Sequence, residues 1–83
     1  MFTLKFYQYF EGNQYRQTVI CAKQYEIVDT GVSKFVIIDD VEYLIGDNLC
    51  EHADVENVHI ETGFDACYIE NSTGKTIDTI RKY

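Results

Sequence analysis

Alternation of apolar and polar side chains with a period of two residues most constrains how this chain can fold. In the first ten residues one face would be apolar, carrying Phe2, Leu4, Phe6 and Phe10, with Gln8 as the exception. The opposite face would carry Thr3, Lys5, Tyr7 and Tyr9. Successive side chains of a β-strand point to opposite faces of the sheet, so this period predicts a strand.

Turn signals then recur about every ten residues, as in small all-β domains. Residues 11–13 (EGN) favour a hairpin that pairs the first strand with residues 14–22, and Asp39-Asp40 favours a tight hairpin between KFVIID and VEYLIG. Further turns are expected at residues 29–33, 46–48, 62–63 and 72–75. The pattern predicts a mainly β fold, a small antiparallel sheet of about five to seven short strands.

Two segments could break this pattern. Residues 22–28 contain helix-favouring Ala, Lys, Gln and Glu, but they are few and lack a cap, so a continuing or bent strand is expected. Residues 49–54 could form one helical turn. If either is helical, the class would be α+β.

The chain has 83 residues, enough for one domain over residues 1–83 with a single modest core. Its three cysteines, Cys21, Cys50 and Cys67, cannot all pair within one chain. The first residues show no signal peptide, and no apolar run approaches the roughly 20 residues of a membrane helix. We therefore expect a cytoplasmic protein whose cysteines are free thiols, buried as small apolar side chains.

Charge is distributed unevenly along the sequence. The formal net charge is −7, but residues 35–74 contain ten acids and neither lysine nor arginine. The other 43 residues contain all seven bases and four acids. The chain is thus electrically two-sided in sequence.

The acidic, histidine-containing middle of the chain could in principle bind a metal or carry out catalysis. Zinc could use Cys50, His52, His59 and Cys67, but their spacing is not that of paired zinc knuckles, and no segment matches a calcium loop. Cys67 with His59 could form a thiolate nucleophile, but no recognisable catalytic motif accompanies them. We expect no metal, no cofactor, no catalytic residue and no enzymatic activity.

Direct nucleic-acid binding is a further alternative. Aromatic and basic side chains would lie together near the first hairpin: Lys5, Tyr7, Tyr9, Tyr15 and Arg16. Strand-based readers of single strands use such aromatics. A chain of charge −7 should repel phosphates, however, so no direct binding of nucleic acid is expected.

The acidic half is easier to understand if its field attracts a basic partner, because segregated like charges cost folding stability. A short, aromatic-rich, strongly acidic β chain with a C-terminal hairpin such as CYIENSTGKTIDTI resembles small bacteriophage proteins. Among these it is similar in type to anti-CRISPR and anti-restriction inhibitors, some of which are DNA mimics. The resemblance implies a protein that acts in the cytoplasm of the host cell.

The predicted function is therefore a non-enzymatic acidic module that occludes the positively charged nucleic-acid-binding surface of a protein or complex. The partner-binding carboxylates would be Asp39, Asp40, Glu42, Asp47, Glu51, Asp54, Glu56 and Glu61. Two alternatives remain open. One is a small structural or accessory phage protein that self-associates, for example as a homodimer, and the other is a small metal- or thiol-dependent enzyme.

Overall fold

A computed structural model of the chain describes residues 1–46 and 59–82. Eight strands make up the described part: β1 (Phe2–Phe10), β2 (Gln14–Ala22), β3 (Glu26–Asp29), β4 (Lys34–Ile38), β5 (Val41–Ile45), β6 (His59–Phe64), β7 (Ala66–Glu70) and β8 (Thr76–Arg81). The predicted mainly β class is confirmed. Within the described ranges there is no helix, and hence none that could cross a membrane.

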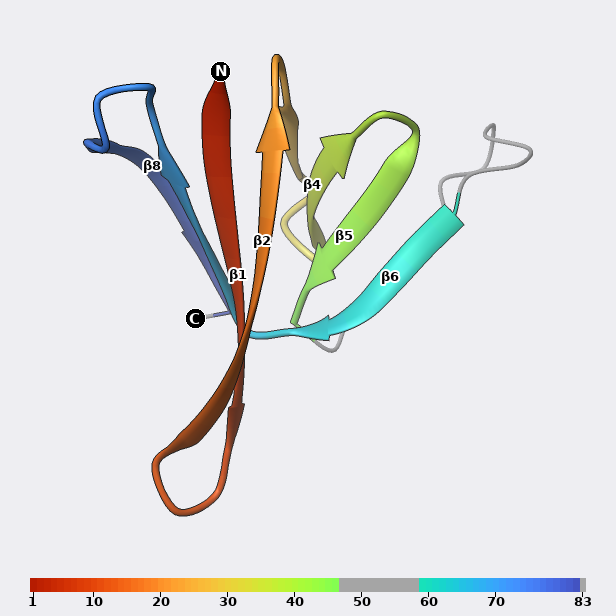
Figure 1. The fold of residues 1–83 in the computed structure, drawn as a ribbon. Coiled ribbons are helices and arrows are strands. Elements are labelled where there is room, and N and C mark those ends of the chain that lie inside the picture. The colour runs from red at the N-terminus through yellow and green to blue at the C-terminus, as the bar shows by residue number, and fades with distance from the viewer. Residues whose placement is uncertain (47–58, 83) are drawn as a thin grey trace.

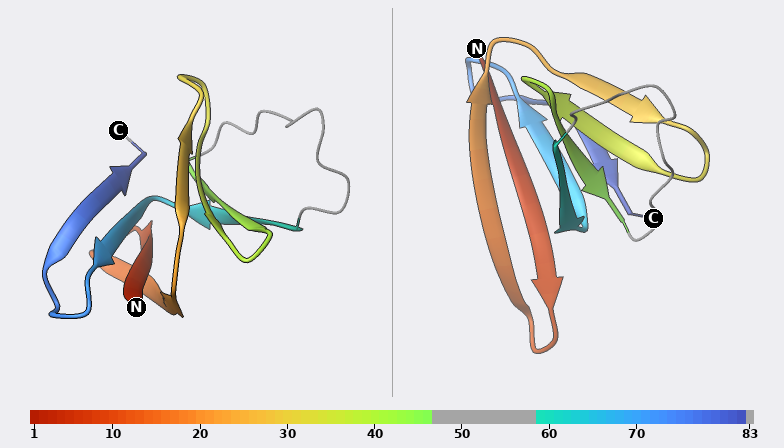
Figure 2. Two further views of the ribbon diagram at one scale, coloured as in Figure 1. Left: turned by 90° about the horizontal axis from the view of Figure 1, so that it is seen from above. Right: turned by 90° about the vertical axis from the view of Figure 1, so that its right-hand side faces the viewer.

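The strands form two four-stranded sheets that meet along one side and diverge from it (Figure 1). Sheet A has the order β2-β1-β7-β8 and is antiparallel throughout. Sheet B has the order β3-β4-β5-β6, in which the last pair, β5 with β6, is parallel. The β1–β2 hairpin extends beyond the rest of the molecule in Figure 1 and in the right-hand view of Figure 2.

The core lies between the two sheets. Sheet A contributes Leu4, Phe6, Ala22, Cys67, Ile69 and Ile80, and sheet B contributes Val36, Ile38 and Ile45. At its centre the ring of Phe6 contacts those of Tyr43 and Phe64, with centroids 4.7 and 5.1 Å away. The alternation seen in the first ten residues thus places the even-numbered side chains of β1 in the core as far as Phe6.

Sheet B is buried on its other face too. Phe35 and Leu44 are register partners that point away from Val36 and Tyr43, and both are buried. Glu42 shares their side of β5 and is only 4% exposed. A strand buried on both faces has a nearly continuous apolar sequence, as in FVII of β4.

The Asp39-Asp40 hairpin forms as predicted. Both residues have positive φ, 49° and 66°, which a two-residue turn of this kind requires at both positions. Aspartate tolerates that conformation better than most residues because its short side chain can bond locally. The turn joins β4 and β5 with Ile38 paired to Val41.

Two other local expectations were wrong. Residues 22–28 do not continue one strand, because β2 ends at Ala22 and β3 begins at Glu26 in the other sheet. Thr62 and Gly63 lie inside β6, and the bend comes later, at Asp65, where the chain passes from sheet B to sheet A. The parallel β5–β6 pair was also not anticipated. The suggested helical turn at 49–54 lies outside the described residues.

Candidate functional site

The charge asymmetry of the sequence becomes an asymmetry between the sheets. The strands and turn of sheet B carry six acids, Glu26, Asp29, Asp39, Asp40, Glu42 and Glu61, and one base, Lys34. The strands, turns and C-terminal extension of sheet A carry five bases and three acids: Lys5, Arg16, Lys75, Arg81 and Lys82 against Glu11, Glu70 and Asp78. Asp65 stands at the junction.

Two of the predicted partner-binding acids lie together. Asp39 and Asp40 are exposed at the β4–β5 turn, and with Glu26 they line a hollow of about 550 Å³. We call Glu26, Asp39 and Asp40 the acidic cluster. Three carboxylates around one open hollow make a local negative field that an incoming cation can reach.

The other predicted acids are placed differently. Glu61 is exposed on β6 and lines a separate hollow with Arg16 and Tyr43. Burial, Glu61 and Asp39 together raise the pKa of Tyr43, so both carboxylates act electrostatically on that ring. Glu42 is buried and presents no carboxylate at the surface. Asp47, Glu51, Asp54 and Glu56 lie outside the described residues.

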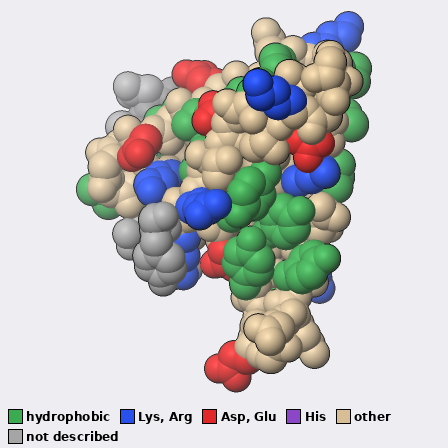
Figure 3. All heavy atoms as spheres, turned by 90° about the vertical axis from the view of Figure 1, so that its left-hand side faces the viewer, with side chains coloured by type: hydrophobic (Ala, Val, Ile, Leu, Met, Phe, Trp, Pro, Cys, Tyr) green, Lys and Arg blue, Asp and Glu red, His purple; other side chains and the backbone are tan. Residues whose placement is uncertain are grey.

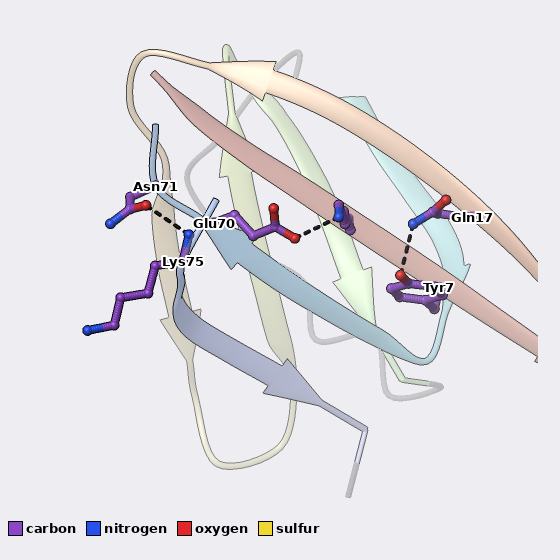
Figure 4. Close-up of polar contacts among 6 residues, drawn as sticks. Tyr7, Gln17, Glu70, Asn71 and Lys75 are labelled. Carbon is purple, nitrogen blue, oxygen red and sulfur yellow. Dashed lines mark hydrogen bonds and ion pairs between the residues drawn. The ribbon is translucent and has the colours of Figure 1, made fainter. Parts of the chain in front are cut away.

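Four tyrosines form a continuous group on the outer face of sheet A, which we call the tyrosine platform: Tyr7, Tyr9, Tyr15 and Tyr68. Tyr7 is at its centre, with ring centroids 6.0 Å from Tyr9, 5.8 Å from Tyr15 and 5.5 Å from Tyr68. The Tyr7 and Tyr9 rings are nearly parallel, 9° apart. Gln17 Nε2 donates a hydrogen bond of 2.8 Å to the Tyr7 hydroxyl (Figure 4).

Register explains why the platform forms. Tyr9 is paired with Tyr15 across the first hairpin, while Lys5 is paired with Tyr68 on β7. Odd-numbered residues of β1 face away from the core, so the platform lies opposite the buried face of sheet A. Tyr9 and Tyr15 are 52% and 63% exposed, which is unusual for large aromatic side chains grouped together.

Cations border the platform. The Arg81 guanidinium carbon lies 5.6 Å from the centroid of the Tyr68 ring, a cation–π distance. Lys5 Nζ is 2.7 Å from Glu70 Oε2, and this partner raises the pKa of Lys5. Figure 3 shows hydrophobic side chains gathered above the projecting hairpin, with lysine and arginine side chains along their border. Figure 4 shows the side chain of Glu70, the partner of Lys5, which points along the sheet and away from Asn71.

A second hollow of about 550 Å³ opens beside the platform. Its lining is Tyr9, Asp65, Ala66, Tyr68, Arg81 and Lys82, and we call it the Tyr9–Tyr68 hollow. Ala66 is paired with Tyr7 on one side and with Arg81 on the other, and its small side chain leaves room between the larger ones. Burial and a hydrogen bond with Tyr68 raise the pKa of Tyr9, so the Tyr9 phenol stays neutral at physiological pH.

Asp65 organises this hollow. Its backbone N–H donates to the Tyr7 carbonyl at 2.8 Å, and its carbonyl accepts from the Lys82 N–H at 2.9 Å. Its carboxylate accepts from the Tyr9 N–H at 2.7 Å and lies 3.9 Å from Lys82 Nζ. One residue therefore ties β1 and the end of β8 to the bend between β6 and β7.

The cysteines differ from one another. Cys67 is buried as expected, and burial raises the pKa of its thiol to about 12, so it is protonated at neutral pH. Cys21 is exposed, contrary to expectation, because it faces outward on the edge strand β2 opposite Thr3. Of the suggested zinc ligands, Cys50 and His52 lie outside the described residues. No group of three or more potential metal ligands occurs among those described.

Sequence reasoning found part of the platform and missed the rest. Arg16, expected beside the tyrosines, is paired with Gln8 and lies on the opposite face. Tyr68 and Arg81 were not anticipated. Alternation in FDACYIEN does separate Tyr68 from Cys67 and Ile69, but only the strand order places β7 next to β1.

Comparison of the chain with protein-family models, with curated proteins and with solved structures found no match.

Proposed function

We propose that the protein is a non-enzymatic binding module whose acidic side docks on the positively charged nucleic-acid-binding surface of a protein or complex. It would act in the cytoplasm, without a cofactor, by occluding that surface. The phage-inhibitor type of protein that the sequence resembles works in this way, and some members mimic DNA.

One observation carries the proposal: the described acids are concentrated on sheet B, with five exposed acids besides the buried Glu42 against one base, while most of the described bases lie on sheet A. An uneven surface field steers a partner of opposite charge into one orientation and speeds its association. The acidic cluster is its best-defined described part, with Asp39 and Asp40 at an exposed tight turn.

Charge removal at the turn tests the proposal. Asp39→Asn with Asp40→Asn removes two charges and keeps a residue type that accepts positive φ. The matched control, Glu11→Gln with Asp78→Asn, removes two charges from sheet A. Binding to basic nucleic-acid-binding proteins, and to an arginine-rich peptide, should weaken several-fold in the first variant and little in the second.

A second variant addresses the acids that the structure does not describe. Reversal of Asp54 and Glu56 to lysine should weaken the same binding further, and the loss should shrink as ionic strength rises. Binding that is indifferent to both variants and to salt would refute the proposal.

A further inference from the structure

We infer that the tyrosine platform and the adjoining Tyr9–Tyr68 hollow bind single-stranded nucleic acid. Unpaired bases stack on the tyrosine rings, and backbone phosphate lies at Arg81 and Lys82. This site is on sheet A and is separate from the acidic cluster proposed above to bind protein.

The location of the rings supports stacking. Tyr7 and Tyr9 are on β1 and Tyr68 is on β7, the two central strands of sheet A. Proteins that read single strands on a sheet place aromatic rings on the open face, where splayed bases can reach them. Each base stacked on an aromatic ring contributes substantially and with little sequence preference, because every base has a π-face.

The Tyr9–Tyr68 hollow adds cationic groups that can contact the phosphate of a nucleotide. Tyr9 and Tyr68 line it together with the Arg81 guanidinium and the Lys82 ammonium group. Its volume of about 550 Å³ falls within the range of small-molecule sites. Among the described residues that line it, Asp65 has the one carboxylate, which already accepts the Tyr9 N–H and lies 3.9 Å from Lys82 Nζ, so its charge is partly offset. Arginine and lysine beside two aromatic rings suit a base attached to a phosphate.

The overall charge of −7 is the main objection, and the fold weakens it. Sheet A and its turns carry five bases against three acids, whereas most of the described acids belong to sheet B. At physiological salt, exposed charges are largely screened beyond about 8 Å. Sheet B lies on the other side of the core from the platform. Sheets that pack face to face are about 10 Å apart, so a strand lying on the outer face of sheet A is farther than the screening length from sheet B.

Single strands fit this surface better than duplexes or a second copy of the chain. In a duplex the bases are stacked on one another and cannot lie on tyrosine rings. Two copies joined face to face through the platform would bring like charges together, Arg81 and Lys82 of one near those of the other.

The test uses two matched pairs of variants and a fluorescent single strand of about ten nucleotides, as oligothymidylate and as oligouridylate. Tyr9→Leu removes a ring from the platform, whereas Phe10→Leu removes an exposed ring from the next residue, on the opposite face of β1. Arg81→Gln removes a cation from the hollow, whereas Arg16→Gln removes one from the opposite face. Anisotropy titrations give affinities, and thermal melts confirm folding.

The expected result is binding that Tyr9→Leu weakens roughly tenfold and Phe10→Leu leaves within about twofold. Arg81→Gln should weaken binding and lower the slope of log affinity against log salt by about 0.7, the share of one phosphate contact, and Arg16→Gln should not. The DNA and RNA arms show whether the ribose hydroxyl matters.

Four outcomes would overturn the inference. They are no binding by the wild-type protein at millimolar concentrations, equal losses in both members of a pair, duplex bound as tightly as single strand, and a dimer that disappears on Tyr9→Leu in sedimentation.

Discussion

The Asp65 carboxylate accepts a hydrogen bond from the backbone N–H of Tyr9 at 2.7 Å, across 56 residues of sequence. The contact fixes the outer end of β1 against the bend at which β6 gives way to β7. It also holds Tyr9, a wall of the hollow on sheet A, in place from the main chain. Fold and candidate site therefore depend on the same residue.

Replacing Asp65 should show this dependence. Asp65→Ala leaves the Tyr9 N–H without its acceptor and should lower the free energy of unfolding by about 1.5–3 kcal/mol, the usual value of a bond to a charged group. Asp65→Asn keeps an oxygen that can accept and should cost less. Urea titrations measure both, and equal losses would mean that the hydrogen bond contributes little.

The buried thiol of Cys67 predicts alkaline destabilisation. Its pKa is about 12 in the folded protein and 9.0 for an unperturbed thiol, so above pH 9 the unfolded chain loses a proton that the folded one keeps. This contribution is complete below pH 9 and is lost between pH 9 and 12, at up to about 1.4 kcal/mol per pH unit.

The control for that prediction is Cys67→Ala. Burial raises the pKa values of Tyr25 and Tyr43 as well. These phenols also lower the stability of the folded protein as pH rises, but only above about pH 10, where they begin to lose their protons in the unfolded chain. The variant, though less stable overall, should therefore begin to lose stability nearer pH 10 than pH 9. The same onset in both proteins would contradict the assignment to Cys67.

Thiol reactivity should separate the two described cysteines. Cys21 is exposed and should react with iodoacetamide in the native protein, whereas Cys67 should react only after unfolding. Peptide mass spectrometry after a timed reaction measures both sites. Modification of Cys67 at the rate of Cys21 under native conditions would mean that the core opens readily.

The position of the core can be tested by removing one methylene group from a buried side chain and from an exposed one. Ile69 is 0% exposed and Ile77, on the neighbouring strand β8, is 44% exposed. Ile69→Val should lower the free energy of unfolding by about 0.5–1.5 kcal/mol, and Ile77→Val should change it by far less. Comparable losses would place Ile77 in the core as well.

Two substitutions at one position of the β4–β5 turn should have opposite effects on stability. Asp40 has a φ of 66°, which glycine adopts freely and valine strongly disfavours. Asp40→Gly should preserve or raise the melting temperature, whereas Asp40→Val should lower the free energy of unfolding by about 1–2 kcal/mol or more. A tolerated valine would show that the turn adopts another conformation.

The sequence predicted local structure well where a single signal decided it. Alternation identified β1, and Asp39-Asp40 identified the tight hairpin, because both depend on residues close together in the chain. Predictions failed where the local structure depended on pairing with strands distant in sequence. Gly63 was expected in a turn, yet it lies within β6 with a φ of 96°, close to the Gln8 side chain.

The candidate surfaces, too, were predictable from the sequence only where they depended on residues close together in the chain. Segregated charge was visible in the sequence, and it became a difference between sheets because residues 35–45 contribute only to sheet B. Glu42 was buried because it shares a side of β5 with Leu44, which no local pattern reveals. The tyrosine platform needed the β1–β7 pairing, which joins residues some 60 positions apart in the chain.

If the two sheets present separate binding surfaces of opposite preference, one pair of NMR titrations on the wild-type protein should show it. An arginine-rich peptide should shift amide signals of β3, β5 and the Asp39-Asp40 turn. A single-stranded oligonucleotide should shift those of β1, β7 and β8, also when the peptide is already bound. Overlapping sets of shifted amides, or displacement of one ligand by the other, would mean that the two surfaces are not separate.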